Sequence, residues 1–291
     1  MAGTVWDVPT KATKRHLAPV ILLVVIAVAV TAYLVARQAK PLLLTVSGCQ
    51  AGKGKAAVSL DPEQAAIAAT IAGVAHRRAM PPRAVVVAYA AALQESKLHN
   101  LSYGDRDSVG VFQQRPSEGW GPAWKLQDPA YASARFFQAL TSVPNYRHKP
   151  VYRAAQAVQH SADGLAYVQY QPVATDLAAD FTGNNAHAVW CWSAGPGPAR
   201  ANLAAARRGL AHAFGPVSSR QAATPGDAPA MLVRVPRPAL GWAVAAWLVT
   251  HATSYGIHEV SYDGYRWRRS SGNSGWTAGK GPERPDLVLA S

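Results

Sequence analysis

Apolar residues cluster along the chain with helical spacing, and the first cluster is the longest. Residues 18–36 contain no charged side chain, and at ~1.5 Å per residue a helix of this length spans roughly 28 Å, close to the hydrocarbon thickness of a bilayer. Slightly more lysines and arginines precede this run than follow it, which favours a cytoplasmic N-terminus. We therefore predict a cytoplasmic tail at 1–17, a single transmembrane anchor in the cell membrane at 18–36, and the rest of the chain outside. A cleaved signal peptide is the alternative.

After a polar tether at residues 37–60, the pattern becomes that of a helical domain over residues 61–214. Asp61 suits the N-cap of a helix that continues to about His76. Pro82 suits the first turn of a second helix, whose body is apolar on every face, so this helix should be buried. Further helices are expected at residues 129–140, 151–161 and 172–181, and a last one ends near Phe214.

The C-terminal part alternates between strand and helix signals. Residues 215–231 have the composition of a linker. A strand at 232–235, a helix at 241–255 and a hairpin around Asp263-Gly264 follow. The predicted fold is therefore mainly α, with one transmembrane helix at the start and a small α+β (β-α-β-β) module at 232–282.

A carboxylate near the end of the second helix is followed by a turn that combines glycine, an aromatic residue and glutamine. Glu95-Ser96 precedes a polar loop, and then come Ser108-Val109-Gly110-Val111-Phe112-Gln113 and Pro116. A low-dielectric surrounding and the negative end of the helix dipole both disfavour the anion of Glu95. A carboxyl group held in this way stays protonated near neutral pH and can act as a general acid.

This pattern resembles the lytic transglycosylases and goose-type lysozymes, which are lysozyme-like folds that cut the glycan of peptidoglycan. The resemblance covers roughly residues 61–214, about half of the chain. It implies a lysozyme-like helical domain in which Glu95 is the catalytic acid and Gln113 lines the sugar cleft. Four neighbours are further candidates for binding the substrate: Ser96, Ser108, Gln114 and Trp120.

The chain departs from this family at one element. The family has a Tyr-Asn-Ala-Gly element after the turn, and the nearest counterpart, residues 154–159, lacks both the tyrosine and the asparagine. Two functions therefore remain open. One is a membrane-anchored enzyme that cleaves glycan strands, and the other is an inactive wall-binding, scaffold or accessory protein. A transport function of its own is disfavoured, because a single span without a charge inside the membrane offers no conduction path.

The number of carboxylates bears on the reaction. Hydrolysis would normally use a second carboxyl group roughly 5–9.5 Å from the first, and Asp105, Asp107 and Glu118 are the candidates. In the family that the chain resembles, the sugar's own hydroxyl attacks and leaves an anhydro end, so that one carboxylate suffices. The sequence favours this transglycosylase chemistry. The loop from Asp105 is similar to the start of a calcium loop, but Val109 occupies its fifth position, and no metal or other cofactor is predicted.

Aromatic residues after the turn have two interpretations. Trp120 lies between glycines and is a candidate for stacking on a sugar ring. Trp124, Phe136 and Phe137 are instead expected in the core.

The two cysteines, Cys49 and Cys191, are expected to form a disulfide, because the predicted location is oxidising. The alternatives are Cys191 as a hydrolase nucleophile, for which no histidine partner motif is present, and Cys49 as a lipoprotein site. The second is disfavoured, because Arg37 and Lys40 separate Cys49 from the apolar run.

The charge of the chain bears on which classes of partner it can bind. The formal net charge is +13 with a pI near 10.0, which would favour acidic wall polymers outside a cell. The basic residues are scattered and no nucleic-acid-binding motif appears, so nucleic acid is not a predicted partner. The charge by itself favours a solvated basic surface without a specific partner, and peptidoglycan strands are the partner that the resemblance implies. Nothing in the sequence specifies an oligomeric state.

Overall fold

The computed structural model describes residues 28–31, 47–54, 57–161, 163–195, 200–223, 228–279 and 286–291. Contacts divide the chain into two units, Met1–Val46 and Ser47–Ser291. Of the first unit, only an exposed helical turn at 28–31 is described. Within the described residues no helix is both long and apolar enough to cross a membrane. Most of the anchor predicted at 18–36 lies outside them.

Two helices form the centre of the second unit, and both begin where the sequence predicts. Helix α2 (Pro62–Arg77) has Asp61 as its N-cap, in a reciprocal capping box with Gln64. Helix α3 (Pro82–Ser96) has Pro82 at its start and is buried along most of its length. An apolar helix of this kind is stable only when other elements cover it. Helices α2, α5, α6 and α7 do so.

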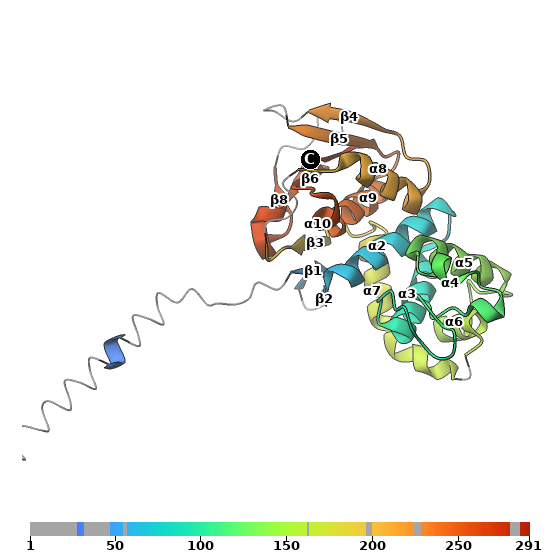
Figure 1. Cartoon of the computed structure of the whole chain (residues 1–291). Coiled ribbons are helices and arrows are strands. Elements are labelled where there is room, and N and C mark those ends of the chain that lie inside the picture. The colour runs from blue at the N-terminus through green and yellow to red at the C-terminus, as the bar shows by residue number, and fades with distance from the viewer. Residues whose placement is uncertain are drawn as a thin grey trace, which may run out of the picture. The chain divides into compact units, whose positions relative to one another are not determined.

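The remaining helices of this half lie close to their predicted positions (Figure 1). Phe136 and Phe137 are fully buried, as expected, whereas Trp124 is 74% exposed and its predicted core position is wrong. Trp124 sits in a four-residue helix with glycine and proline just before it, so the short helix leaves the indole at the surface. The helices are α4 (Ala123–Leu126), α5 (Pro129–Ser142), α6 (Val151–Gln159), α7 (Gln171–Phe181) and α8 (Leu203–Phe214), with 3-10 turns η2 (Pro116–Glu118) and η3 (Gly164–Tyr170).

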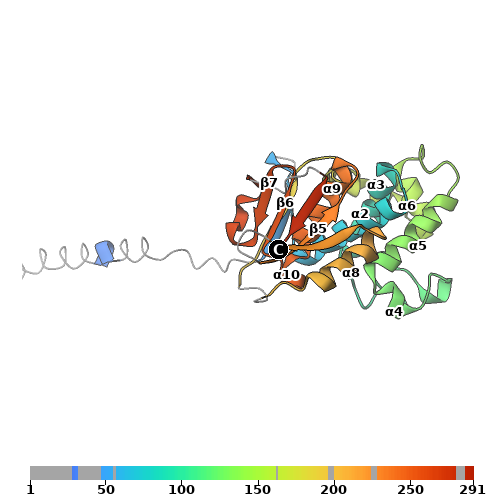
Figure 2. The same cartoon turned by 90° about the horizontal axis from the view of Figure 1, so that it is seen from above.

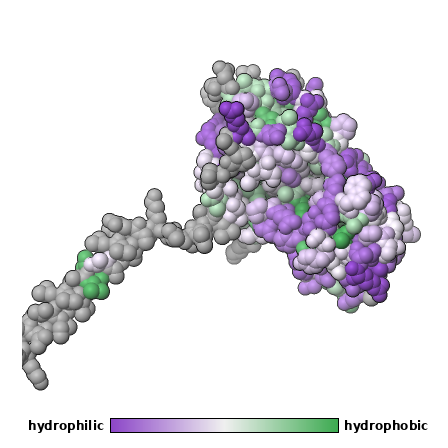
Figure 3. Space-filling model, in the orientation of Figure 1, coloured by the Kyte–Doolittle hydropathy of each residue, from purple (hydrophilic) through white to green (hydrophobic). Residues whose placement is uncertain are grey.

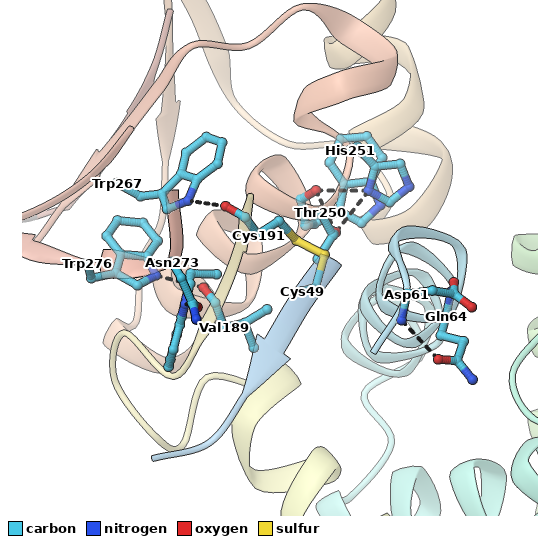
Figure 4. Close-up of a disulfide and its surroundings, with 12 residues drawn as sticks. Cys49, Asp61, Gln64, Val189, Cys191, Thr250, His251, Trp267, Asn273 and Trp276 are labelled. Carbon is cyan, nitrogen blue, oxygen red and sulfur yellow. Dashed lines mark hydrogen bonds between the residues drawn. A yellow bond between two sulfur atoms is a disulfide. The ribbon is translucent and has the colours of Figure 1, made fainter. Parts of the chain in front are cut away.

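A small antiparallel sheet lies beside α2 and contains the predicted disulfide (Figure 4). Strand β1 (Gly48–Ala51) pairs with β2 (Val58–Leu60) on one side and with β3 (Val189–Trp192) on the other. Cys49 and Cys191 are directly opposite one another and are bonded. The described end of the tether predicted at 37–60 is therefore a strand pair rather than an open segment.

A second antiparallel sheet has six strands among the described residues, in the order β4-β5-β9-β6-β7-β8. The predicted β-α-β-β elements are confirmed as β5, α9 with α10, β6 and β7. Asp263 and Gly264 both have positive φ in the β6–β7 turn, as a two-residue hairpin of this type requires. The strands are β4 (Ser219–Ala223), β5 (Pro229–Arg234), β6 (Glu259–Tyr262), β7 (Tyr265–Arg268), β8 (Thr277–Ala278) and β9 (Leu287–Ala290). The remaining elements are α9 (Pro238–Thr250), α10 (Ala252–Tyr255) and the 3-10 segment η4 (Arg269–Ser274).

The fold is mixed α and β, not mainly α. Three segments account for the difference: the end of the tether, the linker predicted at 215–231, and the residues after 282. They supply strands to the two sheets, β4 lying in the linker and β9 in the C-terminal residues. Each strand is short, and β1 and β9 also pair with distant segments, so local patterning gives these strands little signal.

The C-terminal sheet is fastened to the helical half through β3 and α9. The indole of Trp267 donates to the Cys191 carbonyl at 2.9 Å, and that of Trp276 donates to the Val189 carbonyl at 2.7 Å (Figure 4). Gly183, just after α7, has a φ of 78°, and a Cβ there would lie 2.0 Å from the Ala239 oxygen of α9. The two halves therefore share buried contacts. Helices α2 and α9, one from each half, lie side by side (Figure 2).

The surface of this unit is mostly polar. On the face drawn in Figure 3, hydrophobic side chains form small separate patches among polar ones.

The half-buried His251, the C-cap of α9, predicts a loss of stability in mild acid. Burial lowers its pKa to about 4, although Nδ1 donates to the Trp247 carbonyl at 2.8 Å, which opposes the shift. The unfolded chain binds this proton near pH 6.5, so stability falls as the pH drops from about 6.5 to about 4, by up to roughly 3 kcal/mol. His251→Phe, which preserves stacking on Trp247, should flatten the pH dependence of the unfolding free energy over this range. His148→Asn, at an exposed histidine, should leave it as steep as in the wild type.

Candidate active site around Glu95

Glu95 lies in the last turn of α3, and its carboxylate is half-buried. The helix ends at Lys97, which has left-handed geometry with a φ of 56°. The hydroxyl of Tyr167, from η3, donates to Glu95 Oε1 at 2.7 Å. Burial, and after it this hydrogen bond, raises the pKa of Tyr167 well above its usual range. The phenol therefore stays neutral and remains a donor to the carboxylate.

Ser96 connects the end of α3 to the glycine-aromatic-glutamine turn. Its side chain is 5% exposed, and its hydroxyl donates to the Val111 carbonyl at 2.7 Å. The hydroxyl faces inward, so its contribution to the site is to fix the position of Glu95 relative to the turn. This geometry leaves it poorly placed for the substrate contact that the sequence predicts.

The turn itself is held by a backbone bridge between Val109 and Gln114. Gly110 has a φ of 79°, and a Cβ there would meet the Leu126 oxygen at 2.4 Å, so only glycine fits. Phe112 is fully buried and stacks on Phe136 with centroids 4.5 Å apart. A buried aromatic and a glycine in left-handed geometry thus explain why this turn needs these residue types.

The two glutamines of the turn point in different directions. Gln113 has a positive φ of 47° and is half-buried. Its Nε2 donates to the carbonyls of Tyr103 and Gly110, each at 3.2 Å, and its Oε1 lies against Gly104. Gln114 is only 2% exposed, and its Nε2 donates to the Ala132 carbonyl at 3.3 Å. Gln113 thus has the more accessible side chain of the pair.

Ser108 is also largely buried, at 6% exposure, beside the Gly104 backbone. Of the substrate-binding candidates, Ser96, Ser108 and Gln114 therefore lie beneath the surface of the turn. Gln113 and Trp120 are the two with partly accessible side chains.

Helix α6 supplies a contact that the sequence prediction lacked. Gln159, the last residue of α6, donates from Nε2 to the Phe112 carbonyl at 2.7 Å. Tyr167 was missed as well. It lies 72 residues after Glu95, and no local pattern distinguishes it from other tyrosines.

The acidic residues of the loop have separate surroundings. Asp107 accepts hydrogen bonds from Arg115 Nε at 2.9 Å and from the Ser117 amide at 2.8 Å. The Ser117 amide bond, together with the bonds from the Arg115 and Ser117 side chains, lowers the pKa of Asp107 to about 2. Asp105 is exposed, and Glu118 forms an ion pair with Arg115. Asp107 is therefore an ionised carboxylate that orders the loop.

Trp120 lines a hollow of about 340 Å³ together with residues of η2 and α5 and with His160. His160 directly follows Gln159, so this hollow borders the end of α6 that contacts the turn. Arg135 fixes the backbone here by donating to the Trp120 carbonyl at 2.9 Å. The contact of Trp120 with a sugar ring stays a prediction.

Within the described part of the chain, no group of three or more His, Cys, Asp or Glu side chains is arranged to hold a metal ion. The chain matches no protein-family model and no curated protein sequence.

Proposed function

We propose that this chain is a membrane-anchored enzyme of the lysozyme-like superfamily that cleaves peptidoglycan glycan strands outside the cell. In this proposal residues 61–214 are the lysozyme-like domain, residues 18–36 are the anchor, and the C-terminal sheet is a stabilising module. The Cys49–Cys191 disulfide is consistent with an exported protein.

The observation on which the proposal rests most is the arrangement around Glu95. One carboxylate at the end of a buried helix is tied to the glycine-aromatic-glutamine turn through Ser96, and a neutral phenol donates to it. A general acid must be held within hydrogen-bond reach of the atom that it protonates. Two fixed neighbours limit the positions that the Glu95 carboxyl can take.

The mechanism that we propose uses Glu95 twice. Glu95 first donates its proton to the glycosidic oxygen, and the bond from the anomeric carbon to that oxygen breaks. A hydroxyl of the same sugar then attacks the anomeric carbon and gives its proton to Glu95. An anhydro end forms, and Glu95 is again ready to act as an acid.

The surroundings of the other carboxylates support this reaction over hydrolysis. Asp107 has both oxygens engaged by Arg115 and Ser117, and Glu118 is paired with Arg115. A nucleophile or a base that activates water needs a free oxygen directed at the sugar. Asp105 has one, but it lies on an exposed loop with no fixed partner closer than 3.9 Å.

The direct test is digestion of purified cell wall by the full-length chain, with the soluble fragments analysed by mass spectrometry. Transglycosylase activity should release fragments with anhydro ends, which are one water lighter than the corresponding reducing ends. Reducing ends alone would mean hydrolysis, and no fragments at all would contradict the enzymatic proposal.

Tyr167→Phe should lower the rate of fragment release by about tenfold, because a donated hydrogen bond to a charged group contributes roughly 1.5–3 kcal/mol. Binding to wall should change little, since the phenol contacts Glu95 and not the exposed surface. Initial rates at saturating wall and a pull-down measure the two effects. Tyr152→Phe, which removes a hydroxyl elsewhere in the helical half, is the matched control. Equal rates for both variants would show that Tyr167 does not position Glu95.

The second candidate is a protein that binds glycan without cutting it. The observation in its favour is that Ala154 and Ala155 are fully buried at the positions where the family has its Tyr-Asn-Ala-Gly element. Retention on purified wall with no product formed, and with the same retention in Glu95→Gln, would favour this function.

A further inference from the structure

A groove of about 370 Å³ lies between helix α8 and strand β4, away from the residues around Glu95. Its floor is apolar and its rim is basic, a combination that none of the preceding functions uses. Leu203, Ala204, Ala211 and Met231 form the floor, Arg207, Arg208 and Arg220 stand on the rim, and Ser219 and Gln221 line the strand side.

Among the described residues, strand β4 is at the edge of the sheet, and its register shows which of its backbone groups do not bond to β5. The Arg234 amide donates to the Ser218 carbonyl at 2.8 Å, so this pair is hydrogen-bonded. Because hydrogen-bonded and non-hydrogen-bonded pairs alternate in antiparallel sheets, Arg220 and Ala222 also bond to β5. The N–H and C=O groups of Ser219, Gln221 and Ala223 then point away from β5, toward the open edge. Two of these three residues line the groove.

The register has an independent check. Ala223 is opposite Pro229, and proline has no N–H to donate, so this must be a non-hydrogen-bonded pair. Ala223 is therefore in the same kind of pair as Ser219 and Gln221, as the alternation along β4 requires. Ser219 Oγ is in addition buried with no hydrogen-bond partner in the described residues.

The arginines of the rim have no acidic partner in the part of the chain that the structure describes. Among the described residues, none of the three guanidinium groups forms an ion pair or a hydrogen bond. Arg207 and Arg208 come from the helix and Arg220 from the strand, so the charges stand on both sides of the groove. A ligand lying between α8 and β4 would therefore meet positive charge from both elements.

We propose that this groove binds an extended acidic peptide segment, which adds to β4 as a further strand and lies between β4 and α8. The open edge supplies backbone hydrogen bonds, the apolar floor accepts one face of the strand, and the arginines pair with carboxylates. A peptide is favoured over other anions because only an extended backbone satisfies alternate N–H and C=O groups at a sheet edge. The proposal is independent of the reaction at Glu95.

The test uses a fluorescent seven-residue peptide in which glutamate alternates with valine and threonine, titrated with the full-length chain in mild detergent. Saturable binding is expected, and the same peptide with glutamine in place of glutamate should bind at least about tenfold more weakly. The triple variant Arg207→Gln/Arg208→Gln/Arg220→Gln should lose about as much. A matched variant with the same change of net charge, Arg78→Gln/Arg147→Gln/Arg200→Gln, should bind as the wild type does.

A backbone variant separates strand addition from simple charge attraction. Gln221→Pro removes an N–H that faces the open edge and none that β5 uses, so the fold should tolerate it. It should nevertheless weaken the acidic peptide by roughly tenfold while the melting temperature stays near that of the wild type.

Three outcomes would overturn the proposal. One is equal binding of the glutamate and glutamine peptides, and another is equal loss in the two arginine triples. The third is full displacement of the peptide by inorganic polyphosphate together with unchanged binding in Gln221→Pro, which would mean charge attraction without an added strand. Activity on cell wall should be the same in all of these variants, so failure here leaves the function at Glu95 untouched.

Discussion

Replacing Glu95 by glutamine is expected to lower the release of anhydro-ended fragments from purified wall by roughly 10²–10⁴-fold. The amide cannot supply the proton that the glycosidic oxygen needs, and it cannot accept one from the attacking hydroxyl. Glutamine has nearly the same shape as glutamate, and its carbonyl oxygen can still accept from Tyr167. The loss should therefore come from chemistry and not from misfolding.

The measurement is the initial rate of fragment release by mass spectrometry, with the thermal unfolding of each variant recorded alongside. Asp176→Asn is the matched control, because Asp176 is an exposed carboxylate on α7 in the same half of the molecule. This control should keep wild-type activity. Full activity of Glu95→Gln would reject the proposed mechanism.

A second variant tests whether the reaction uses one carboxylate or two. If Asp105 acted as a second carboxylate, Asp105→Asn would abolish activity as completely as Glu95→Gln does. Because Asp105 is exposed and only loosely paired, we expect its variant to remain within a few-fold of the wild type. The reaction would then depend on one carboxylate, as transglycosylase chemistry allows.

The helices were predictable because their signals are local. Asp61 begins α2 through its own side chain, and Pro82 begins α3 through a ring that already has helical geometry. Asp263 and Gly264 likewise specify a hairpin by their own tolerance of positive φ. In each case the residues that decide the structure lie within a few positions of it.

The strands were harder, because what stabilises them lies far away in the sequence. Strand β1 has four residues, and its partner β3 begins more than 130 positions later. Strand β9 is apolar because it lies in the middle of the larger sheet, between β5 and β6. Each of these two strands is too short for its alternation of apolar and polar residues to distinguish it from an irregular segment.

In the candidate site, too, some features follow from local sequence and others depend on distant residues. Glu95 and the turn at Gly110 were found from a motif within one short stretch. The inward direction of Ser96 and Gln114 could not be deduced, since a motif gives the position of a residue and not the side on which it is covered. Tyr167 depends on how η3 packs against α3. Trp124 shows the converse, because a large aromatic residue in a four-residue helix can remain outside the core.

Removal of the disulfide by Cys49→Ser and Cys191→Ser should be the most destabilising change in the folded unit. The two cysteines are 142 residues apart in sequence, and closing so long a loop contributes about 5 kcal/mol in the chain-entropy model. That is a large fraction of the roughly 5–15 kcal/mol by which a domain is stable. The sheet formed by β1, β2 and β3 is too small to keep its place without this bond.

The expected result is a large drop in the guanidinium midpoint of the double serine variant, with much of the helical circular dichroism retained in its native baseline. Reduction of the wild type by dithiothreitol should reproduce the drop, and the same reagent should leave the double variant unchanged. Trp267 and Trp276 donate to the β3 backbone, so their fluorescence should report the loosening of this strand before the helices unfold. An unchanged midpoint would mean that the tryptophan contacts alone hold β3, and that the disulfide adds little to the free energy of unfolding.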